Sequence, residues 1–390
     1  MKYVDHLPVD GKTVFLRVDF NVPLREGKVE DDTRIRAALP TINYLLQRRA
    51  KLVLASHLGR PRGKVVKELS LKPVAEHLGK LLGRPVKFSP QTVGEEADRM
   101  KEQIKEGDVL LLENLRFNPG ETKDDVEFAS QLARGIEVYV NDAFGTCHRA
   151  HASVHALAKL ISVKGAGFLI KKEVENLSKA LLNPSHPYVL IVGGAKVSDK
   201  IPVLENLMGH ADRVLVGGAM AYTFLKALGR PVGDSLVEEE RLEDAERILR
   251  EAEERGIEFL LPRDHRCVRE IKPGAEMRIM DEIESGWKGV DIGPETEKIY
   301  REKITDAATV VWNGPMGIFE IEEFSHGTVA VARAVAESSA FSVVGGGDSA
   351  SAVKKAGVSD KISHISTGGG ASLEFLSGKP LPGLQALEEK

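Results

Sequence analysis

Short apolar runs that end in polar or glycine residues alternate with amphipathic segments along most of the chain, and this alternation constrains the fold more than any other feature. The runs that predict buried strands are Thr13–Phe20, Leu52–His57, Val109–Asn114, Val138–Phe144, Val189–Gly194, Val214–Gly218, Val310–Gly314 and Phe341–Gly347. Segments with helical spacing lie between them, for example Arg34–Arg49, Lys72–Leu82, Leu242–Arg255 and Thr296–Ile304. Neighbouring parallel strands need a crossover connection, and a helix supplies it. The sequence therefore predicts an α/β fold of doubly wound, Rossmann-like parallel sheets with helices on both faces.

The length of 390 residues predicts two domains rather than one. A single hydrophobic core stops growing at roughly 250 to 300 residues. The segment Gly165–Pro184 begins with Gly-Ala-Gly and ends with Asn-Pro around a helical run, near the midpoint of the chain. It predicts a connecting helix with hinges at its ends, and an ordinary surface helix is the alternative. We therefore expect domains at residues 1–167 and 185–370, joined by residues 168–184.

Composition and charge exclude several classes of function. The net charge of −4 gives no electrostatic reason to expect nucleic acid or a membrane surface as a partner. The two cysteines, Cys147 and Cys267, exclude a disulfide framework and a cysteine-rich zinc site, and they favour a reducing compartment. Met1–Pro8 carries charged side chains instead of an apolar leader, and no later run is long enough to span a membrane. We therefore expect a cytoplasmic protein.

The predicted strand ends of the first half are rich in arginine and histidine. In open α/β sheets, ligands bind outside the carboxyl ends of the strands, so residues there are the first candidates for a site. The candidates are Asp19, Asn21, His57, Leu58, Gly59, Arg60, Arg116 and Arg149, to which we add Arg34. Guanidinium groups match carboxylate and phosphate, so the cluster predicts a small substrate with more than one anionic group. For any single arginine, a solvated surface charge is the alternative.

Three histidines of the same region, His148, His151 and His155, have a spacing that metal ligands can show. The cysteine or carboxylate pattern typical of a zinc site does not accompany them. We therefore expect ordinary hydrogen-bonding roles for these side chains.

The predicted strand ends of the second half are rich in glycine. The glycine-rich turns are Gly193–Lys196, Gly217–Ala219, Asn313–Pro315, Gly345–Ser349 and Thr367–Gly370. Glycine lets a ligand approach the backbone closely, and the first N–H groups of a following helix attract phosphate oxygens. Several such turns indicate a nucleotide, with Lys196 as a mobile positive charge and Asp348 as a carboxylate for Mg²⁺. Close packing of strand and helix is the alternative reason for glycine in any one turn.

Three familiar nucleotide-binding signatures are absent from the sequence. No segment matches Gly-x-x-x-x-Gly-Lys-Ser/Thr, because Gly59–Lys64 is one residue short and is followed by Val65. No Gly-x-Gly-x-x-Gly follows a predicted strand, which weakens an oxidoreductase interpretation, and the protein-kinase signature is missing. The residues therefore indicate a phosphotransferase of another class.

The chain resembles the phosphoglycerate kinase family over essentially its whole length, from Arg17–Pro23 to Ser366–Ser372. The motifs between these ends follow the family's order: SHLGRP at 56–61, ENLRF at 113–117, DAFGTCHRAHAS at 142–153, GGAKVSDK at 193–200, VWNGPMGIFE at 311–320 and GGGDS at 345–349. Two positions depart from the family pattern, Ser349 where threonine is frequent and Cys147 where alanine is frequent. Neither is expected to change the reaction, since serine can also bond a phosphate and Cys147 replaces no basic residue.

The resemblance implies reversible, Mg²⁺-dependent phosphoryl transfer between ATP and 3-phosphoglycerate in glycolysis, with ADP and 1,3-bisphosphoglycerate as the other pair. It also implies a monomer with a central cleft, in which residues 371–390 return to the N-terminal domain. At the phosphoglycerate it places Asp19, Asn21, Arg34, His57, Arg60, Arg116 and Arg149. At the nucleotide it places Lys200, Gly293, Glu320, Gly346, Gly347, Asp348 and Ser349, with Asp348 toward the metal. Gly217, Gly218, Asn313 and Pro315 join them as residues of the glycine-rich turns.

Direct in-line transfer needs positioning and charge stabilisation, and it needs no nucleophilic side chain. We assign catalytic roles to Arg34 on the substrate side, to Lys196 beside the transferring phosphoryl group, and to the amides around Gly369 and Gly370. Hinge-bending closure of the domains is expected to bring the ligands together and to exclude water. The rival interpretations are an oxidoreductase or ligase on the same kind of sheet, and a catalytically silent anion-binding protein.

Overall fold

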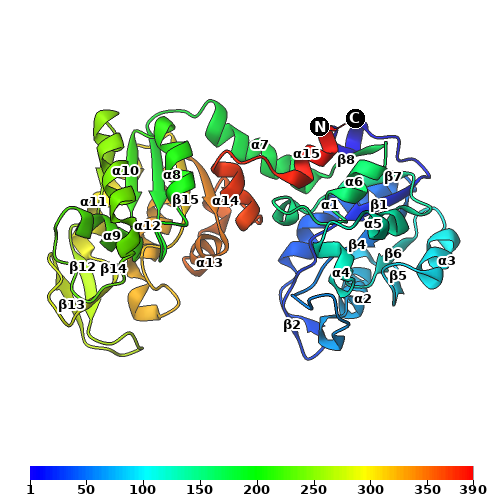
Figure 1. The fold of residues 1–390 in the computed structure, drawn as a ribbon, viewed down its shortest axis with the longest axis horizontal. Helices are drawn as coiled ribbons and strands as arrows, with labels where there is room; N and C mark the ends of the chain where they lie inside the picture. Colours follow the sequence, from blue (N-terminus) through cyan, green and yellow to red (C-terminus); the bar gives the residue numbers. More distant parts are fainter. Residues whose placement is uncertain (390) are drawn as a thin grey trace. The chain divides into compact units, whose positions relative to one another are not determined.

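The structure is a computed structural model that describes residues 1–389, and these form two units (Figure 1). Unit 1 comprises Met1–Val174 with the described residues from Pro380 onward, and unit 2 comprises Glu175–Lys379. The chain therefore passes between the units twice, once within helix α7 (Phe168–Leu182) and once after Lys379.

The boundaries predicted from the sequence differ from these units at both crossings. Residues 168–174, predicted as part of the connecting helix, belong to unit 1. Residues 371–379 belong to unit 2, although the returning segment is predicted to begin at residue 371. Residue 390, the last of that segment, lies outside the described residues.

Unit 1 is built on a six-stranded parallel sheet with the strand order β5-β6-β4-β1-β7-β8. Its strands are β1 (Thr13–Arg17), β4 (Lys51–Ala55), β5 (Val86–Ser89), β6 (Val109–Leu112), β7 (Val138–Asn141) and β8 (Lys164–Ala166). Its helices are α1 (Thr33–Gln47), α2 (Lys72–Leu82), α3 (Glu95–Gln103), α4 (Pro119–Thr122), α5 (Val126–Ala133), α6 (Ala156–Leu160) and α15 (Pro382–Glu388), with the first part of α7. A short hairpin of β2 (Leu24–Arg25) and β3 (Lys28–Val29) follows β1.

Alternate residues of the central strands cover the two faces of this sheet. Leu16 of β1 and Val140 of β7 pack with α1 and α2 in one apolar core. Phe15 and Tyr139 face the opposite side, where their ring centroids lie 6.0 Å apart. Because both faces are buried, the strands read as continuous apolar runs, and the polar residues concentrate where the strands end.

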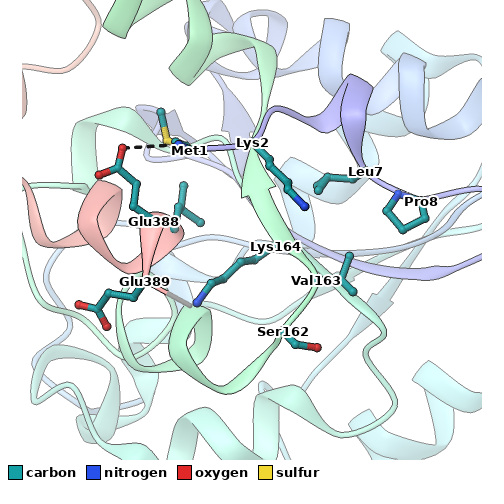
Figure 2. A pocket seen from close by; sticks show the side chains of 10 residues that line it. Met1, Lys2, Leu7, Pro8, Ser162, Val163, Lys164, Glu388 and Glu389 are labelled. Atoms are coloured by element: carbon teal, nitrogen blue, oxygen red, sulfur yellow. Dashed lines mark ion pairs between the residues drawn. The ribbon is translucent and has the colours of Figure 1, made fainter.

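The two ends of the described chain meet in unit 1. The α-amino group of Met1 lies 3.7 Å from Oε1 of Glu388, and the N–H of Gly383 donates to the carbonyl of Cys147 at 2.9 Å. Helix α15 contacts α6 and β8. A cavity of about 430 Å³ lies at this junction. Figure 2 shows the side chain of Lys164 among the residues that line it. The terminal helix therefore lies at the β8 edge of the sheet.

Unit 2 is built on a second six-stranded parallel sheet, with the strand order β11-β10-β9-β15-β16-β17. Its strands are β9 (Tyr188–Val192), β10 (Arg213–Val216), β11 (Glu258–Leu260), β15 (Thr309–Asn313), β16 (Phe341–Gly345) and β17 (His364–Ile365). Its helices are α8 (Ile201–Leu207), α9 (Met220–Ala227), α10 (Leu242–Glu254), α11 (Pro294–Thr305), α12 (His326–Glu337), α13 (Gly347–Lys355) and α14 (Gly370–Leu376), with the last part of α7. A small antiparallel sheet contains β12 (His265–Val268), β13 (Met277–Met280) and β14 (Lys288–Ile292), with β12 in the middle.

The order of the strands in unit 2 reverses between β9 and β15. Strands β10 and β11 lie beyond β9, whereas β16 and β17 lie beyond β15. Such a switch point leaves a crevice outside the carboxyl ends of the two strands, where ligands bind in doubly wound sheets. The N–H of Gly193 donates to the carbonyl of Asn313 at 3.0 Å, so the turns after β9 and β15 are joined at their start.

The predicted fold class of two doubly wound parallel sheets is confirmed. All eight predicted strands are present, but each ends earlier than predicted, for example β1 at Arg17 instead of Phe20 and β7 at Asn141 instead of Phe144. The polar residues after these points form loops instead of pairing in the sheet. Among residues 1–389, no helix has both the length and the apolar character that a membrane crossing needs.

Candidate substrate and nucleotide sites

A basic cavity of about 350 Å³ lies at the carboxyl ends of the unit 1 strands. Its lining residues are Arg60, Arg62, Gly63, Arg116, Pro119, Thr122, Lys123, Arg149 and His151. Arg60 follows β4, Arg116 follows β6 and Arg149 follows β7. These three loops reach one edge because their strands are parallel. The structure thus brings together three of the arginines that the strand ends predict.

Hydrogen bonds hold the loops of this cavity against one another. The side chain of Asn114 accepts from the N–H of Leu58 at 3.1 Å and donates to the carbonyl of Leu58 at 2.7 Å. The N–H of Gly59 donates to Oδ1 of Asn21 at 2.9 Å, and Nη1 of Arg116 donates to the carbonyl of Gly59 at 2.8 Å. Asn21, Leu58 and Gly59 therefore fix the loop after β4 against the loops after β1 and β6.

Positive charge accumulates in this cavity with few opposing groups. Burial lowers the pKa of Arg116 to about 10, and the charges of Arg149 and Arg17 add to the effect. Burial also lowers the pKa of His151 to about 4, with the charge of Arg116 as the next cause, so this imidazole is neutral at pH 7. Nε of Arg116 and Nδ1 of His151 are buried and have no hydrogen-bond partner among the described residues. A bound anion with several oxygens would offset the repulsion and offer acceptors to the guanidinium groups.

Arg34 and His57 share the electrostatic environment of this basic cluster. Arg34 lies in the first turn of α1, and its Nη1 is 2.6 Å from Oδ2 of Asp19 in the loop after β1. His57 is buried, and burial lowers its pKa well below the ordinary value, helped by the charges of Arg17, Arg116 and Arg34. Its imidazole is therefore neutral and can serve as a hydrogen-bond donor without adding another charge.

Cys147 and His155 near the cavity have ordinary structural surroundings. Cys147 is buried, and burial raises its pKa to about 12, so its reactive thiolate scarcely forms at pH 7. Nδ1 of His155 lies 2.6 Å from Oδ2 of Asp124. In the part of the chain that the structure describes, no three His, Cys, Asp or Glu side chains are grouped to hold a metal ion.

A second cavity, of about 470 Å³, lies at the switch point of unit 2. Its lining residues are Gly194, Ala195, Gly218, Ala219, Tyr222, Asp234, Leu236, Ile271, Lys288, Gly289, Val290, Pro315, Gly317, Ile318, Glu320 and Asp348. The turns after β9, β10 and β15 provide backbone on one side, and β14 provides the facing wall. Leu236 is 56% exposed and Ile271 is 47% exposed, so two large apolar side chains stand open to a ligand. An apolar cavity with a few carboxylates suits a planar base that carries a polar tail.

Glycine serves two different purposes in the turns around this cavity. A side chain at Gly193 would collide with the carbonyl of Pro315, and one at Gly314 would collide with the carbonyl of Gly193. These glycines are required because the two turns pack backbone against backbone. By contrast, nothing lies within 4 Å of the position that a Cβ would take at Gly347 or Gly369. A phosphate can therefore approach the backbone at those two positions.

Seven of the eleven predicted nucleotide residues lie outside the lining of the cavity, namely Lys200, Gly217, Gly293, Asn313, Gly346, Gly347 and Ser349. A side chain at Gly217 would collide with the sulfur of Met316. A side chain at Gly293 would collide with the carboxylate of Asp264, which accepts from the N–H of Thr296 at 2.8 Å in the first turn of α11. Packing is therefore the reason for glycine at Gly217 and Gly293.

Lys200, Asn313 and Ser349 lie outside the lining of the nucleotide cavity but contact one another or the turns that line it. The Lys200 ammonium donates to Oδ1 of Asn313. Burial lowers the pKa of Lys200, and nearby carboxylates, among them that of Asp348, oppose the shift. Ser349 is buried, and its Oγ accepts from the N–H of Gly314 at 2.7 Å. This bond ties the start of α13, where Gly346 and Gly347 lie, to the turn after β15.

Lys196 lies exposed on the turn after β9, and Glu238 holds the loop that carries it. The carboxylate of Glu238 accepts from the N–H of Ser198 at 3.1 Å and from its hydroxyl at 2.6 Å. Burial alone would raise the pKa of Glu238, but the bonds from Ser198 and the charge of Lys196 keep it below its ordinary value. Gly369, with φ of +52°, immediately precedes α14, which begins at Gly370.

The carboxylates at this cavity fit Mg²⁺ that arrives with a nucleotide. Mg²⁺ is usually held by one or two protein carboxylates together with substrate phosphates, and it retains several waters. Asp348 and Glu320 line the same cavity, and Asp348 is exposed in the first turn of α13. The residues present therefore match the requirement of a nucleotide-borne Mg²⁺.

Several lining residues are absent from the set that the sequence predicts. In unit 1 they include Arg62 and Lys123, and in unit 2 they include Tyr222, Leu236 and Ile271. Arg62 could have been found, because it lies two residues after Arg60 in the same loop. Leu236 and Ile271 carry no local signal, since their segments do not follow a strand of the main sheet.

Comparison with known proteins agrees with this geometry. The pattern of the family described as Phosphoglycerate kinase matches residues 4–379. A phosphoglycerate kinase of Anaeromyxobacter dehalogenans is 57% identical over 394 residues and 100% of both chains, and one of Thermosipho africanus is 53% identical over 98% of this chain and 97% of its own. The solved phosphoglycerate kinase from Coxiella burnetii has a TM-score of 0.91 and 43% identity over 99% of this chain and 98% of that chain. The one from Pyrococcus horikoshii has a TM-score of 0.85 and 36% identity over 100% of this chain and 98% of that chain.

Proposed function

The chain belongs to the phosphoglycerate kinase family, and we propose that its two cavities divide the ligands of the reaction between them. The enzyme is a phosphotransferase of glycolysis that moves a phosphoryl group between ATP and 3-phosphoglycerate, with Mg²⁺ as cofactor. In this proposal the basic cavity of unit 1 holds 3-phosphoglycerate or 1,3-bisphosphoglycerate. The cavity of unit 2 holds ATP or ADP.

The basic cavity suits a ligand that carries a carboxylate at one end and a phosphate at the other. Arg60, Arg116 and Arg149 offer guanidinium groups from three separate loops, and such groups bind both kinds of anion through paired hydrogen bonds. Arg34, oriented by Asp19, adds a fourth. His57 contributes a neutral donor, and Asn21 acts through the position of Gly59.

The cavity of unit 2 suits a nucleotide. Leu236 and Ile271 provide apolar contact for the base, and Glu320 lies on the same lining as a polar partner. Lys200 and the backbone around Gly347 are assigned to the phosphates, because one supplies a positive charge and the other an open helix start.

Transfer itself requires charge stabilisation at the moving phosphoryl group. Arg34 and Lys196 are assigned to this role, together with the backbone amides around Gly369 and Gly370. In the direction that forms ATP the leaving group is a carboxylate, which is stable at neutral pH, so no general base is needed. Asp348 is assigned to hold Mg²⁺, which when bound supplies charge neutralisation on the nucleotide phosphates.

The two ligands react only when the attacking oxygen and the phosphorus are about 3 to 3.5 Å apart. Each ligand is assigned to its own unit, so we propose a closing motion of the units in the ternary complex. Small-angle scattering tests this motion: the radius of gyration should fall with 3-phosphoglycerate and a non-reactive MgATP analogue together, and fall less with either alone. An unchanged radius in the saturated ternary complex would reject the motion.

The observation that carries the assignment of unit 1 is the convergence of Arg60, Arg116 and Arg149 on one cavity, where Nε of Arg116 has no hydrogen-bond partner among the described residues. Titration calorimetry with Arg149→Ala and Asp348→Asn separates the two cavities. We expect Arg149→Ala to raise the Kd for 3-phosphoglycerate by roughly tenfold or more, with the Kd for MgADP unchanged. Asp348→Asn should raise the Kd for MgADP and leave the Kd for 3-phosphoglycerate unchanged.

The matched control for this titration is Arg99→Ala, which removes an arginine that is 65% exposed on α3. It should leave both dissociation constants at the parent values. If Arg149→Ala weakened MgADP as much as 3-phosphoglycerate, the division of ligands between the cavities would be wrong.

We also propose that the enzyme is cytoplasmic and monomeric. The buried, reduced cysteines support a reducing compartment. Sedimentation of the purified protein at micromolar concentration should give a single species near 42.6 kDa, and a dimer would contradict the proposal.

A further inference from the structure

A series of hydrogen-bonded, buried polar groups lies near the carboxyl ends of the unit 1 strands. It runs from Glu121 to His57. Arg17, the last residue of β1, is fully buried, as are Ser153 and Glu121. Nε of Arg17 lies 2.8 Å from Oγ of Ser153, and Oγ of Ser153 lies 2.6 Å from Oε1 of Glu121. At the other end, Nη2 of Arg17 lies 3.2 Å from Nδ1 of His57.

The chemistry of arginine fixes the direction of the two hydrogen bonds that Arg17 makes to Ser153 and His57. A guanidinium group has donors and no acceptor. Oγ of Ser153 must therefore accept from Arg17, and it donates its own proton to Glu121. Nδ1 of His57 must likewise accept from Nη2 of Arg17, so it carries no proton.

His57 is consequently held in a single tautomer. Burial lowers its pKa well below the ordinary value, so the ring is neutral and holds one proton. Since Nδ1 accepts from Arg17, that proton is on Nε2, where no described residue makes a hydrogen bond. The free Nε2–H is a donor for an anionic oxygen.

Glu121 anchors this arrangement to the wall of the basic cavity. Its Oε2 accepts from the N–H of Ser153 at 2.9 Å, and its own carbonyl accepts from the N–H of Ala152 at 2.9 Å. The hydroxyl of Tyr139, on β7, donates to the carbonyl of Ser153 at 2.8 Å. The segment that carries His151 is thereby fixed to α4, which contributes Pro119 and Thr122 to the same cavity, and Lys123 follows the helix there.

We propose that Arg17 and Glu121, linked by Ser153, are positioning residues that hold His57 as an Nε2–H donor toward the anionic substrate. The role in substrate binding rests on the proposed function of the basic cavity, whereas the tautomer rests on the hydrogen bonds alone. Neither Arg17 nor Glu121 has to touch the substrate for this role. The guanidinium is occupied by Ser153, His57 and the carbonyl of Val18.

The test is nitrogen-15 NMR of histidine side chains in the full-length, ligand-free protein, with the signals of His57 identified by their loss in His57→Gln. The two-bond couplings between each ring nitrogen and the hydrogens on the ring carbons show which nitrogen is protonated. The parent protein should show Nδ1 unprotonated and Nε2 protonated at pH 7. A parent spectrum with the proton on Nδ1, or with a charged ring, would overturn the proposal without any further variant.

Ser153→Ala and Arg17→Met then test the positioning chain itself. Each should produce a second population of His57 with the proton on Nδ1, and each should raise the KM for 3-phosphoglycerate by roughly three- to tenfold while the KM for MgATP stays unchanged. The matched control is Ser130→Ala on the exposed face of α5, where the hydroxyl donates only to the carbonyl of Val126. It should leave the spectrum and both constants at the parent values.

A spectrum of His57 that is identical in the parent and in folded Ser153→Ala would overturn the chain from Glu121 to His57. A shifted tautomer with an unchanged KM would instead show that the hydrogen bonds exist but that His57 does not bind the substrate. The first result concerns this inference, and the second concerns the assignment of the basic cavity, so the two failures are distinguishable.

Discussion

Nη1 of Arg34 lies 2.6 Å from Oδ2 of Asp19, and this ion pair joins the first turn of α1 to the loop after β1. The Arg34 side chain is 39% exposed, so part of its guanidinium remains open to a ligand while Asp19 orients the rest. A donor that is oriented before the substrate binds needs little rearrangement at the moment of transfer. The pair therefore supports a catalytic role for Arg34.

Arg34→Ala should lower kcat by about 10² to 10³, the usual effect of removing one preorganised donor to a developing negative charge. Arg36→Ala is the matched control, because Arg36 lies on the same helix and pairs only with Asp32 at the exposed surface. Steady-state kinetics and circular dichroism on both variants check this prediction. A kcat within a few-fold of the parent for folded Arg34→Ala would remove this residue from the mechanism.

Lys196→Ala should lower kcat by a similar factor, about 10² to 10³, because the exposed ammonium is assigned to the transferring phosphoryl group. The fold should be unaffected, since the loop is held by Glu238 and Ser198 and not by the lysine. Lys226→Ala serves as the control. It removes a partly exposed lysine of α9 that pairs with Glu239. Equal activities of the two variants would argue against the role of Lys196.

Asp348→Asn should raise the concentration of Mg²⁺ that gives half-maximal activity, because one carboxylate of the metal site is lost. The same substitution at Asp360, which is exposed after the end of α13, should leave the requirement unchanged. Titration of activity with MgCl₂ at a fixed, saturating nucleotide concentration measures the effect. Superimposable titration curves for Asp348→Asn and the parent would show that Asp348 does not hold the metal.

Asp142 should make the stability of the parent protein depend on pH. Burial raises the pKa of its carboxyl group to about 7, whereas the pKa of an aspartate in an unfolded chain is about 3.9. Between these values the folded chain keeps a proton that the unfolded chain has released, so the free energy of unfolding falls as pH rises, by about 1.4 kcal/mol per pH unit within the window.

Asp142→Asn removes this dependence and keeps the acceptor for the N–H groups of Leu169 and Ile170. Urea unfolding at pH 5 and pH 8 should therefore show a smaller loss of stability in the variant than in the parent. Asp291 is also buried with a pKa of about 7, but it titrates in both proteins and cancels in the comparison. Equal losses of stability between pH 5 and pH 8 in the parent and in Asp142→Asn would contradict the raised pKa of Asp142.

Much of the fold was predictable because the central strands of both sheets are buried on both faces. Val189–Val192 and Val310–Trp312 are continuous apolar runs for this reason, and runs of this kind are easy to recognise. Strand β13 was missed because most of its residues are exposed, and β17 because it has two residues. The order of the strands was also out of reach, because pairing depends on contacts between distant segments.

The candidate site was predictable where it follows strand ends and where family motifs match. Arg60, Arg116 and Arg149 follow three strands, and the structure brings them to one cavity. Arg17 was predicted as a strand residue at the start of a family motif and was given no role in the site, although its side chain contacts His57. Glu121 carries no sequence signal, because its role depends on a hydrogen bond across 32 positions of the chain.

Transfer of a phosphoryl group from MgATP to the carboxylate of 3-phosphoglycerate is tested most directly by incubating the purified protein with both compounds and hydroxylamine, which traps an acyl phosphate as a hydroxamate. We expect equal amounts of ADP and hydroxamate, both dependent on 3-phosphoglycerate and on Mg²⁺, and both strongly reduced in Arg34→Ala. ADP released with inorganic phosphate in the absence of 3-phosphoglycerate, without hydroxamate in its presence, would contradict this activity.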